Sequence, residues 1–341
     1  MAKAGNYYYD QLNKEQQKAY YAIKEGLLNL QDSFAVPRLT QKELSDIYFM
    51  IRMDSPAIFY SVTFSYRFYP DSTMVEMVPQ YLFTKDKIKE HRQAMESRVK
   101  KLARQAVNLD EKGKELFIHD FIVENVKYDK LKKAYSHEII GALGNGVAVC
   151  EGIAKAVKIL CDELNIWCII ALSEANPDKG IKYRHAWNVI RINGQYYHLD
   201  VTFDNTLSKD GTVRYDYVNL SDKQIFRDHE PVIWKVPACN DNDHFYYKEK
   251  KISWTTLEEV QNRTKQAVKK GKILLFHWRG GYLTKEVLAQ LMEIFDKEAA
   301  AKEKTAYVSV NWPQAVLRVR FAEGVGEEQL EMEEANEGEK K

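Results

Sequence analysis

The chain has 341 residues, of which 45% are hydrophobic and 29% are charged, and its formal net charge is +1. It is long enough for two or three packed units and has the composition of an ordinary globular protein. The near-zero net charge gives no global field toward nucleic acid or a membrane surface, so neither is expected as a partner. No run of the sequence approaches the ~20 apolar residues of a membrane span.

Helices and one aromatic strand pair are predicted in the N-terminal third. The aromatic and β-branched residues of 58–69, followed by the turn signal Pro70-Asp71, indicate a strand that returns through 73–78. The dense charges of 86–107 favour a solvated helix face over an interaction surface. Apolar residues at helical spacing predict four helices, at residues 9–30, 40–53, 86–107 and 112–126.

A helix headed by a cysteine follows in the segment GNGVAVCEGIAKAVKILCDEL. Cys150 stands at its start, where the unpaired N–H groups and positive end of a helix favour a thiolate. Gly146 and Gly152 allow close backbone approach on either side. A packing role for Cys150 is the alternative. Helical spacing places four residues toward the core: Ala154, Val157, Cys161 and Leu164.

Asn193-Gly194 lies between two alternating runs and predicts a hairpin with a two-residue turn. Ile192 then pairs with Gln195, which sets Trp187 opposite Asp200 and His185 opposite Thr202. His185 and Asp200 become diagonal neighbours on one face, roughly 7–8 Å apart by backbone and within side-chain reach. A slip of one residue would place them on opposite faces. A lone histidine in a strand is often structural, but its placement beside Asp200 favours a catalytic role for His185.

The C-terminal part alternates helix and strand, with elements predicted at 257–270, 273–278, 284–302, 305–312 and 315–321. Thr284 is the expected N-cap of the second helix. From Glu323 the chain is glutamate-rich with almost no apolar residues, which favours disorder. We therefore expect four parts: an N-terminal helical and strand extension (7–107), a core (108–248), a small α/β module (250–322) and an acidic disordered tail (323–341).

The four cysteines, at 150, 161, 168 and 239, form no dense framework and no CxxC pair, which disfavours a disulfide scaffold or a structural zinc site. Cys161 and Cys168 are expected in the core. The N-terminus has no apolar stretch of the signal-peptide kind. A cytoplasmic location is expected for the sequence as given, and a secreted or cell-surface location if an export signal was removed.

Three segments resemble the transglutaminase-like superfamily of papain-type fold, in particular its bacterial branch. They are VCEGIAKA around Cys150, RHAWNVI around His185 and YYHLDVTFD around Asp200. The resemblance extends upstream through FIVENVKYD and GALGNG and downstream through YDYVNLSDKQIFRDH. It covers most of residues 7 to 250. Where many relatives carry an aromatic residue and a tryptophan, this chain has Ile153 and Phe203, and both positions stay apolar.

The resemblance implies an α+β fold. A papain-like transglutaminase core, with the cysteine helix packed on the small antiparallel sheet that carries His185 and Asp200, is joined to an N-terminal α/β extension and a small C-terminal α/β module. It implies Cys150 as nucleophile, His185 as base and Asp200 as the group that orients the base. A thioester at an amide bond of a protein or peptide substrate, released by water or by an amine, would make the chain a protease, amidase, deamidase or cross-linking enzyme. The alternative is a non-catalytic binding or scaffold protein that retains the fold.

Further residues near the triad have weaker signals. The backbone N–H of Cys150 is expected to donate to the oxyanion, with His137 or Tyr135 as the second donor. A surface role for His137 is the alternative. Trp187 shares the face of His185 and either walls the site or packs in the core. Asn188 points to the opposite face, which disfavours a catalytic role.

No metal and no cofactor are expected. His185, His198 and Asp200 could be drawn as a three-ligand zinc site, but His185 and His198 are separated along the hairpin and Cys150 would have no task. His198 is therefore interpreted as a structural residue. The calcium dependence of animal transglutaminases is not carried over, because no acidic loop of the required kind is evident.

Overall fold

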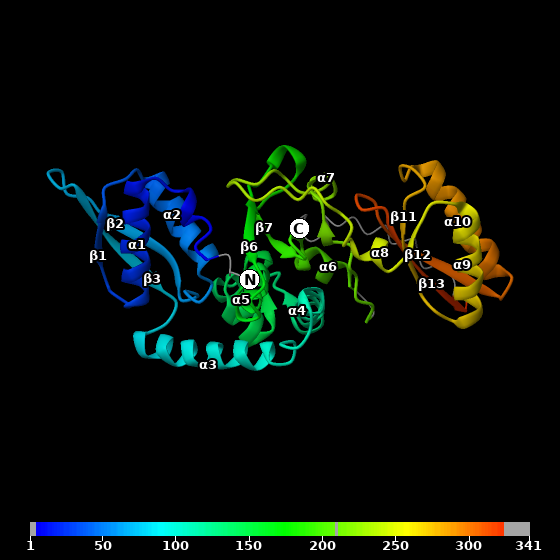
Figure 1. Ribbon diagram of the computed structural model, residues 1–341, viewed down its shortest axis with the longest axis horizontal. Helices are drawn as coiled ribbons and strands as arrows, with labels where there is room; N and C mark the ends of the chain where they lie inside the picture. The colour runs from blue at the N-terminus through cyan, green and yellow to red at the C-terminus, as the bar shows by residue number, and fades with distance from the viewer. Residues whose placement is uncertain (1–4, 209–210, 324–341) are drawn as a thin grey trace.

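The structure is a computed structural model that describes residues 5–208 and 211–323. Three sheets of three or four strands, each with its own helices, follow one another along the long axis of the molecule (Figure 1), and β4 and β5 form a further two-stranded sheet. A disordered tail was predicted for 323–341. Glu323 is instead the last residue of a strand, and 324–341 lie outside the described residues. No helix among the described residues is long and apolar enough to cross a membrane.

The N-terminal part packs two helices against a three-stranded antiparallel sheet of order β1-β3-β2. Asn13 and Thr40 cap the two helices, and each accepts a hydrogen bond from the third residue of its helix in a capping box. Helix α3 then runs from this sheet toward the core (Figure 1). The elements are η1 Tyr9–Gln11, α1 Lys14–Leu28, β1 Phe34–Pro37, α2 Gln41–Asp54, β2 Ser61–Arg67, β3 Met74–Tyr81 and α3 Lys85–Ala103.

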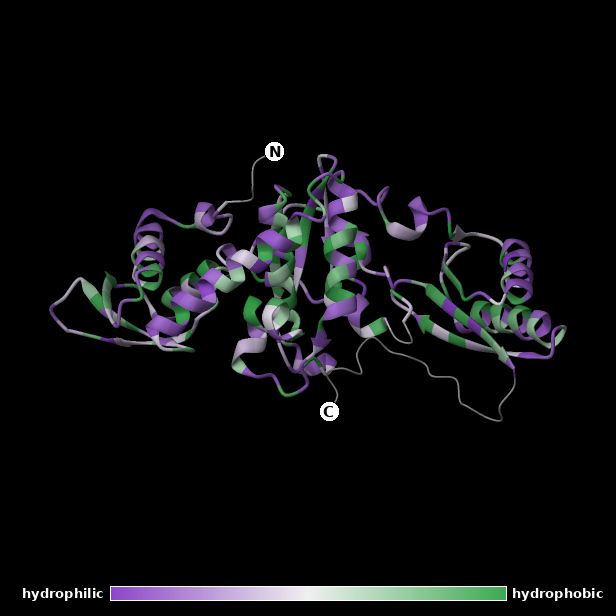
Figure 2. Cartoon of the chain, turned by 90° about the horizontal axis from the view of Figure 1, so that it is seen from below, coloured by the Kyte–Doolittle hydropathy of each residue, from purple (hydrophilic) through white to green (hydrophobic). Residues whose placement is uncertain are grey.

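The central part packs helix α5 against a four-stranded antiparallel sheet of order β6-β7-β8-β9. The central helices carry hydrophobic stripes, as Figure 2 shows. Ala154, Val157 and Cys161 of α5 and its C-cap Leu164, which were expected to face the core, are buried, and so is Cys168. The elements are α4 Glu111–Asn125, β4 Lys127–Tyr128, η2 Ala134–His137, η3 Ile140–Asn145, β5 Val147–Ala148, α5 Cys150–Glu163, β6 Cys168–Ser173, η4 Pro177–Lys179, β7 His185–Ile192, β8 Gln195–Leu199, α6 Val201–Leu207, β9 Val218–Leu220 and α7 Asp222–Ile225.

The C-terminal part has a sheet of order β10-β11-β13-β12 with α9 and α10 on one of its faces (Figure 1). The Thr284 side chain accepts a hydrogen bond from Val287 N, which confirms the predicted N-cap of α10. Asn311 of β12 donates to Asp216 at 2.9 Å and ties this part to the core. The elements are α8 Tyr246–Glu249, β10 Ser253–Trp254, α9 Leu257–Lys270, β11 Leu274–Trp278, α10 Lys285–Ala300, β12 Lys304–Asn311 and β13 Val316–Glu323.

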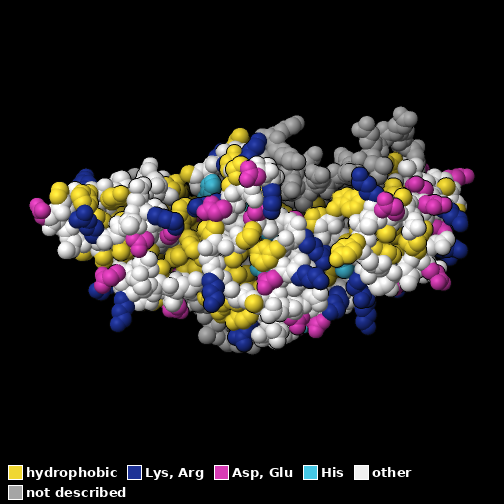
Figure 3. Space-filling model, turned by 90° about the horizontal axis from the view of Figure 1, so that it is seen from above, with side chains coloured by type: hydrophobic (Ala, Val, Ile, Leu, Met, Phe, Trp, Pro, Cys, Tyr) yellow, Lys and Arg dark blue, Asp and Glu magenta, His cyan; other side chains and the backbone are white. Residues whose placement is uncertain are grey.

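Positive and negative side chains are interspersed on the face shown in Figure 3, in keeping with the small net charge. The charged helix α3 turns most of its side chains to solvent, and its buried residues are Ile88, Met95, Val99, Leu102 and Ala103. This exposure supports the interpretation of its charge run as a solvated face.

Candidate active site

The hairpin has the predicted register. Strands β7 and β8 pair with Ile192 opposite Gln195 and Asn188 opposite Leu199. Asn193 and Gly194 have φ of 50° and 87°, the left-handed values that a type I′ turn requires. The turn therefore fixes which residues of β7 lie beside the end of β8.

Asp200 was expected to continue strand β8, but it does not. Pairing ends at Leu199, and Asp200 becomes the N-cap of α6, where its Oδ1 accepts the N–H groups of Thr202 at 2.8 Å and Phe203 at 3.0 Å. The predicted pairing of Trp187 with Asp200, and of His185 with Thr202, was therefore wrong. His185 and Asp200 still meet, because His185 Nε2 lies 2.6 Å from Asp200 Oδ2.

Cys150 is the first residue of α5, after the N-cap Val149, and it is partly exposed. Its side chain is close enough to the His185 ring to raise the pKa of that histidine. Because Nε2 of His185 faces Asp200, the nitrogen left for the thiol is Nδ1. Cysteine, histidine and aspartate thus lie in the linear order that thiol activation requires.

Helix α5 packs on the sheet, but its body covers the face opposite to His185. Asn188 Nδ2 donates to Ala154 O at 3.0 Å, and Ala186 and Ile190 share one hydrophobic cluster with α5. Trp187 and Val189 belong to a separate cluster on the other face. Cys150 reaches His185 because both are the first residues of their elements, at one edge of the contact between helix and sheet.

The buried charges around His185 favour its protonated form. Burial acts to lower the pKa of His185, but the Asp200 carboxylate and the Cys150 side chain hold this pKa well above its ordinary value. Burial acts to raise the pKa of Asp200, but His185 and then His229 hold it below its ordinary value. Asp200 is fully buried and His185 is nearly so, which strengthens their interaction.

His229 is a site residue that sequence reasoning missed. Its Nε2 lies 2.8 Å from Asp200 Oδ2, the same oxygen that faces His185, and its Nδ1 lies 2.8 Å from Asp228 Oδ1. The segment RDHE around it carries four titratable residues, a pattern that indicates a solvent-exposed loop. In the structure His229 is 7% exposed.

Trp187 underlies the site rather than lining an open surface. It is 1% exposed, and its ring stacks on the His185 ring at 5.8 Å between centroids. Its Nε1 donates to His198 Nδ1 at 2.9 Å. Phe203 also contacts both histidines, at 4.9 Å from His185 and 4.5 Å from His229 between ring centroids.

A buried cluster of four charges lies beside the cysteine. Arg52 of α2 pairs with Glu138 and, at 3.0 Å, with Glu151. Lys155 Nζ lies 2.8 Å from both Glu138 and Glu151. The two cations balance the two carboxylates. Although burial acts to raise the pKa of Glu151, Lys155 and Arg52 hold it well below its ordinary value.

The turn that carries Tyr135 and His137 lies against the first turn of α5. Val149 N donates to Ser136 O at 3.0 Å, and a Cβ on Gly152 would lie 2.2 Å from the same carbonyl oxygen. Gly152 is therefore required for this approach. His137 Nδ1 lies 3.1 Å from Glu151 Oε2, which leaves Nε2 as its outward nitrogen.

Two clusters of metal-type ligands occur among the described residues, and neither is the set drawn from the sequence. They are His185, Asp200 and His229, and His198, Asp222 and Cys239. In the second, Trp187 donates to Nδ1 of His198, so Nε2 carries the hydrogen and faces Asp222 Oδ1 at 2.8 Å. The ring nitrogens of His198 are thus both engaged, in keeping with its structural interpretation.

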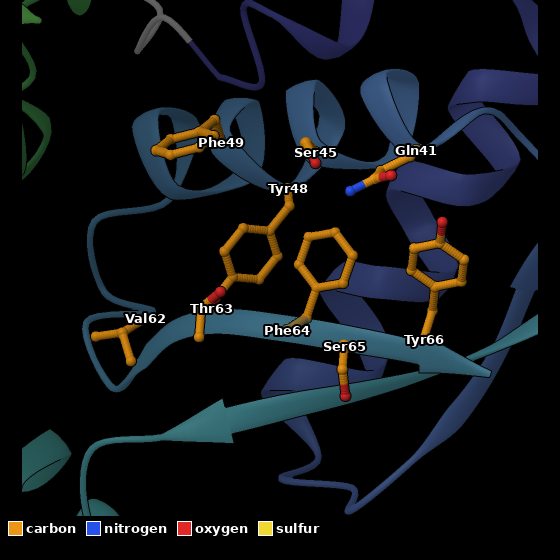
Figure 4. Close-up of a pocket in the computed structure, with 9 residues that line it drawn as sticks. All are labelled: Gln41, Ser45, Tyr48, Phe49, Val62, Thr63, Phe64, Ser65 and Tyr66. Atoms are coloured by element: carbon orange, nitrogen blue, oxygen red, sulfur yellow. The ribbon is translucent and has the colours of Figure 1, made fainter.

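A hollow of about 460 Å³ lies outside this site, between α2 and β2. Figure 4 shows Tyr48 and Phe49 of α2 on one side and Phe64 and Tyr66 of β2 on the other. It contains none of the triad. The Phe49 ring contacts the guanidinium of Arg184, the residue before His185, at 5.6 Å.

Residues 100–201 match the family model of the transglutaminase-like superfamily. This central segment of the chain is similar to the transglutaminase-like core. The match ends one residue after Asp200, so it includes all three predicted triad residues. The expected fold class is confirmed, and this family supports cysteine-based activity of a general kind. No curated protein matches the chain.

Three solved structures are similar to parts of this chain. One is described as a candidate cysteine protease from Cytophaga hutchinsonii, with 18% identity over 41% of this chain and 62% of that one, and a TM-score of 0.27. A protein described as a TGase has 11% identity over 50% and 51%, with a TM-score of 0.26. A candidate protease from Parabacteroides distasonis has 13% identity over 41% and 39%, with a TM-score of 0.25. The chain spans less than two thirds of each, and these low scores carry no argument about activity.

Proposed function

We propose that the chain is a cysteine-dependent enzyme that forms a thioester on Cys150 at an amide carbonyl of a protein or peptide. The observation that carries this proposal is that Asp200 Oδ2 lies 2.6 Å from His185 Nε2, while the Cys150 side chain is close enough to the same ring to raise its pKa. Asp200 favours the imidazolium form of His185, the base beside Cys150. A thiolate and imidazolium pair is the activated form of a cysteine nucleophile.

In the proposed reaction the Cys150 sulfur attacks the carbonyl carbon and the carbonyl oxygen takes the negative charge. The first-turn N–H of Cys150, which has no partner within the helix, donates to this oxygen. His137 Nε2 is our candidate for the second donor, because Glu151 holds the other ring nitrogen. His185 then gives its proton to the departing amine, and the thioester bond remains.

The second half of the reaction depends on the acceptor. Water on the thioester carbon releases an acid and restores the thiol, which is hydrolysis or deamidation. A primary amine at the same carbon gives a new amide, which is cross-linking. Asp200 keeps the His185 tautomer that can remove a proton from either acceptor.

Mass spectrometry of the protein incubated with amide and peptide libraries tests the proposal. A covalent acyl adduct on Cys150 is expected in the wild type and not in Cys150→Ala, and added primary amine shows how the adduct partitions. An adduct that persists in Cys150→Ala would refute the assignment. So would iodoacetamide alkylation of Cys150 no faster than that of N-acetylcysteine at the same pH, because this would make Cys150 an ordinary thiol.

A further inference from the structure

The Asp200 carboxylate is held by four donors, and one of them, His229, is a side chain outside the triad. Oδ1 accepts the backbone N–H groups of Thr202 and Phe203. Oδ2 faces two imidazoles, His185 at 2.6 Å and His229 at 2.8 Å. An ionised carboxylate offers about four acceptor positions, so Asp200 is fully occupied. His229 is the only partner of Oδ2 other than His185 among the described residues.

The surroundings of His229 determine its protonation. Its two ring nitrogens each lie 2.8 Å from a carboxylate oxygen, on Asp200 and on Asp228. Ionised carboxylates only accept hydrogen bonds, so a ring that donates to both of them is in the imidazolium form. Although burial acts to lower the pKa of His229, these two carboxylates raise it. The other titratable groups that face this ring among the described residues are His185 at 5.2 Å and Tyr217 at 5.7 Å between centroids, and His198.

We propose that His229 is a positioning residue that holds Asp200 Oδ2 at His185 Nε2 and thereby keeps the Cys150 and His185 pair activated. The proposal rests on the proposed function of Cys150. The backbone donors on Oδ1 fix one oxygen of Asp200, and His229 fixes the direction of the other. Asp228 holds His229 in turn, and Asp228 Oδ2 accepts the Tyr217 hydroxyl at 2.5 Å.

Two substitutions of His229 separate its two hydrogen bonds. Glutamine places an N–H near the position of Nε2 and can still donate to Asp200. Asparagine places an N–H near the position of Nδ1 and can still donate to Asp228. Both side chains are neutral and similar in size. If His229 has a purely structural role, the reactivity of the Cys150 thiol should rise and fall with the thermal stability of the variants. If His229 positions Asp200, the thiol should stay reactive only in variants that keep a donor to Asp200.

The readout is the rate of Cys150 alkylation by iodoacetamide at pH 6, measured by peptide mass spectrometry and referred to N-acetylcysteine. His229→Ala and His229→Asn are expected to lower this rate roughly 10-fold or more, as when an outer partner of a functional histidine is removed. His229→Gln is expected to stay within a few-fold of the wild type. Melting temperatures are measured on the same samples.

Each outcome decides the proposal. Wild-type alkylation no faster than N-acetylcysteine would end both this inference and the proposed function. An activated wild type with an equally reactive His229→Ala or His229→Asn would overturn this inference alone. If the alanine variant fails to fold, the glutamine and asparagine variants still decide. Equal rates for these two, or rates that follow their melting temperatures, would also overturn it.

Discussion

Replacement of Arg52 by methionine tests whether the N-terminal helix α2 stabilises the cysteine helix. The Arg52 side chain is 5% exposed and pairs with Glu138 and Glu151, the residue after Cys150. Methionine has a similar length and no charge. The variant therefore leaves the buried Glu138 and the partly buried Glu151 with one cation of the cluster, Lys155, in place of two.

The expected loss of stability is large. Removal of one partner from a buried ion pair costs about 3–5 kcal/mol, because the remaining charge stays desolvated. Glu138 and Glu151 both keep Lys155 at 2.8 Å, so we expect the lower end, about 3 kcal/mol. The double variant Arg52→Met, Glu138→Gln leaves Lys155 and Glu151 balanced. It should recover most of this loss, since a neutral replacement of a buried pair is often tolerated.

Denaturant unfolding followed by tryptophan fluorescence measures these differences. Arg67→Met is the matched control, because Arg67 pairs with Glu76 in the same N-terminal part but is 64% exposed. Its expected cost is below about 1 kcal/mol. Equal unfolding midpoints for Arg52→Met and Arg67→Met would show that the buried cluster does not stabilise the fold. A double variant with a lower unfolding midpoint than the single variant Arg52→Met would refute the charge-balance argument.

Two further variants test the site. Asp200→Asn removes the carboxylate that raises the pKa of His185. In the wild type the imidazolium persists above the ordinary histidine pKa of ~6.5, and in the variant it should lose its proton at a lower pH than in the wild type. The alkaline limb of the pH–rate profile should move to lower pH, and the rate should fall by on the order of 10³–10⁴-fold. A limb that does not move would contradict Asp200 as the cause of the raised His185 pKa. Gly152→Ala should destabilise, since its Cβ would meet the Ser136 carbonyl at 2.2 Å, although the same change in an open helix stabilises by about 1 kcal/mol. Gly113→Ala in α4, which meets only side-chain atoms at 3.0 Å or more, is the thermal-unfolding control, and equal melting temperatures would contradict the close approach.

The hairpin could be predicted because its determinants are local. Asn193 and Gly194 accept left-handed φ, and the turn alone sets the register of β7 and β8. The same local reasoning failed at Asp200. The segment VTFD alternates like a strand, but Val201–Leu207 is a helix of seven residues, too short for helical periodicity to be visible. The Asp200 side chain caps that helix and ends the strand.

The buried charges could not be predicted, because long-range partners bury them. Arg52 and Glu138 are 86 residues apart, and His229 and Asp200 are 29 apart. Lys155 and Lys158 lie on α5 at positions that helical spacing makes available to the core, yet lysine is almost never fully buried unless it is paired. Sequence patterns indicate the average exposure of a residue type. A lysine that is buried because it pairs with a distant carboxylate has no neighbouring residues that reveal this pairing.

The same charges bear on the parts 7–107 and 108–248 that we expected from the sequence. One hydrophobic cluster runs from Tyr8 and Ile51 in the first part to Val157 and Val218 in the second. Arg52 adds a buried cation from the first part to carboxylates of the second. Separation of the two would expose this apolar surface and leave Glu138 and Glu151 with one buried cation. We therefore propose that the two parts fold as one unit, and that α2 contributes to the placement of Cys150 through Glu151.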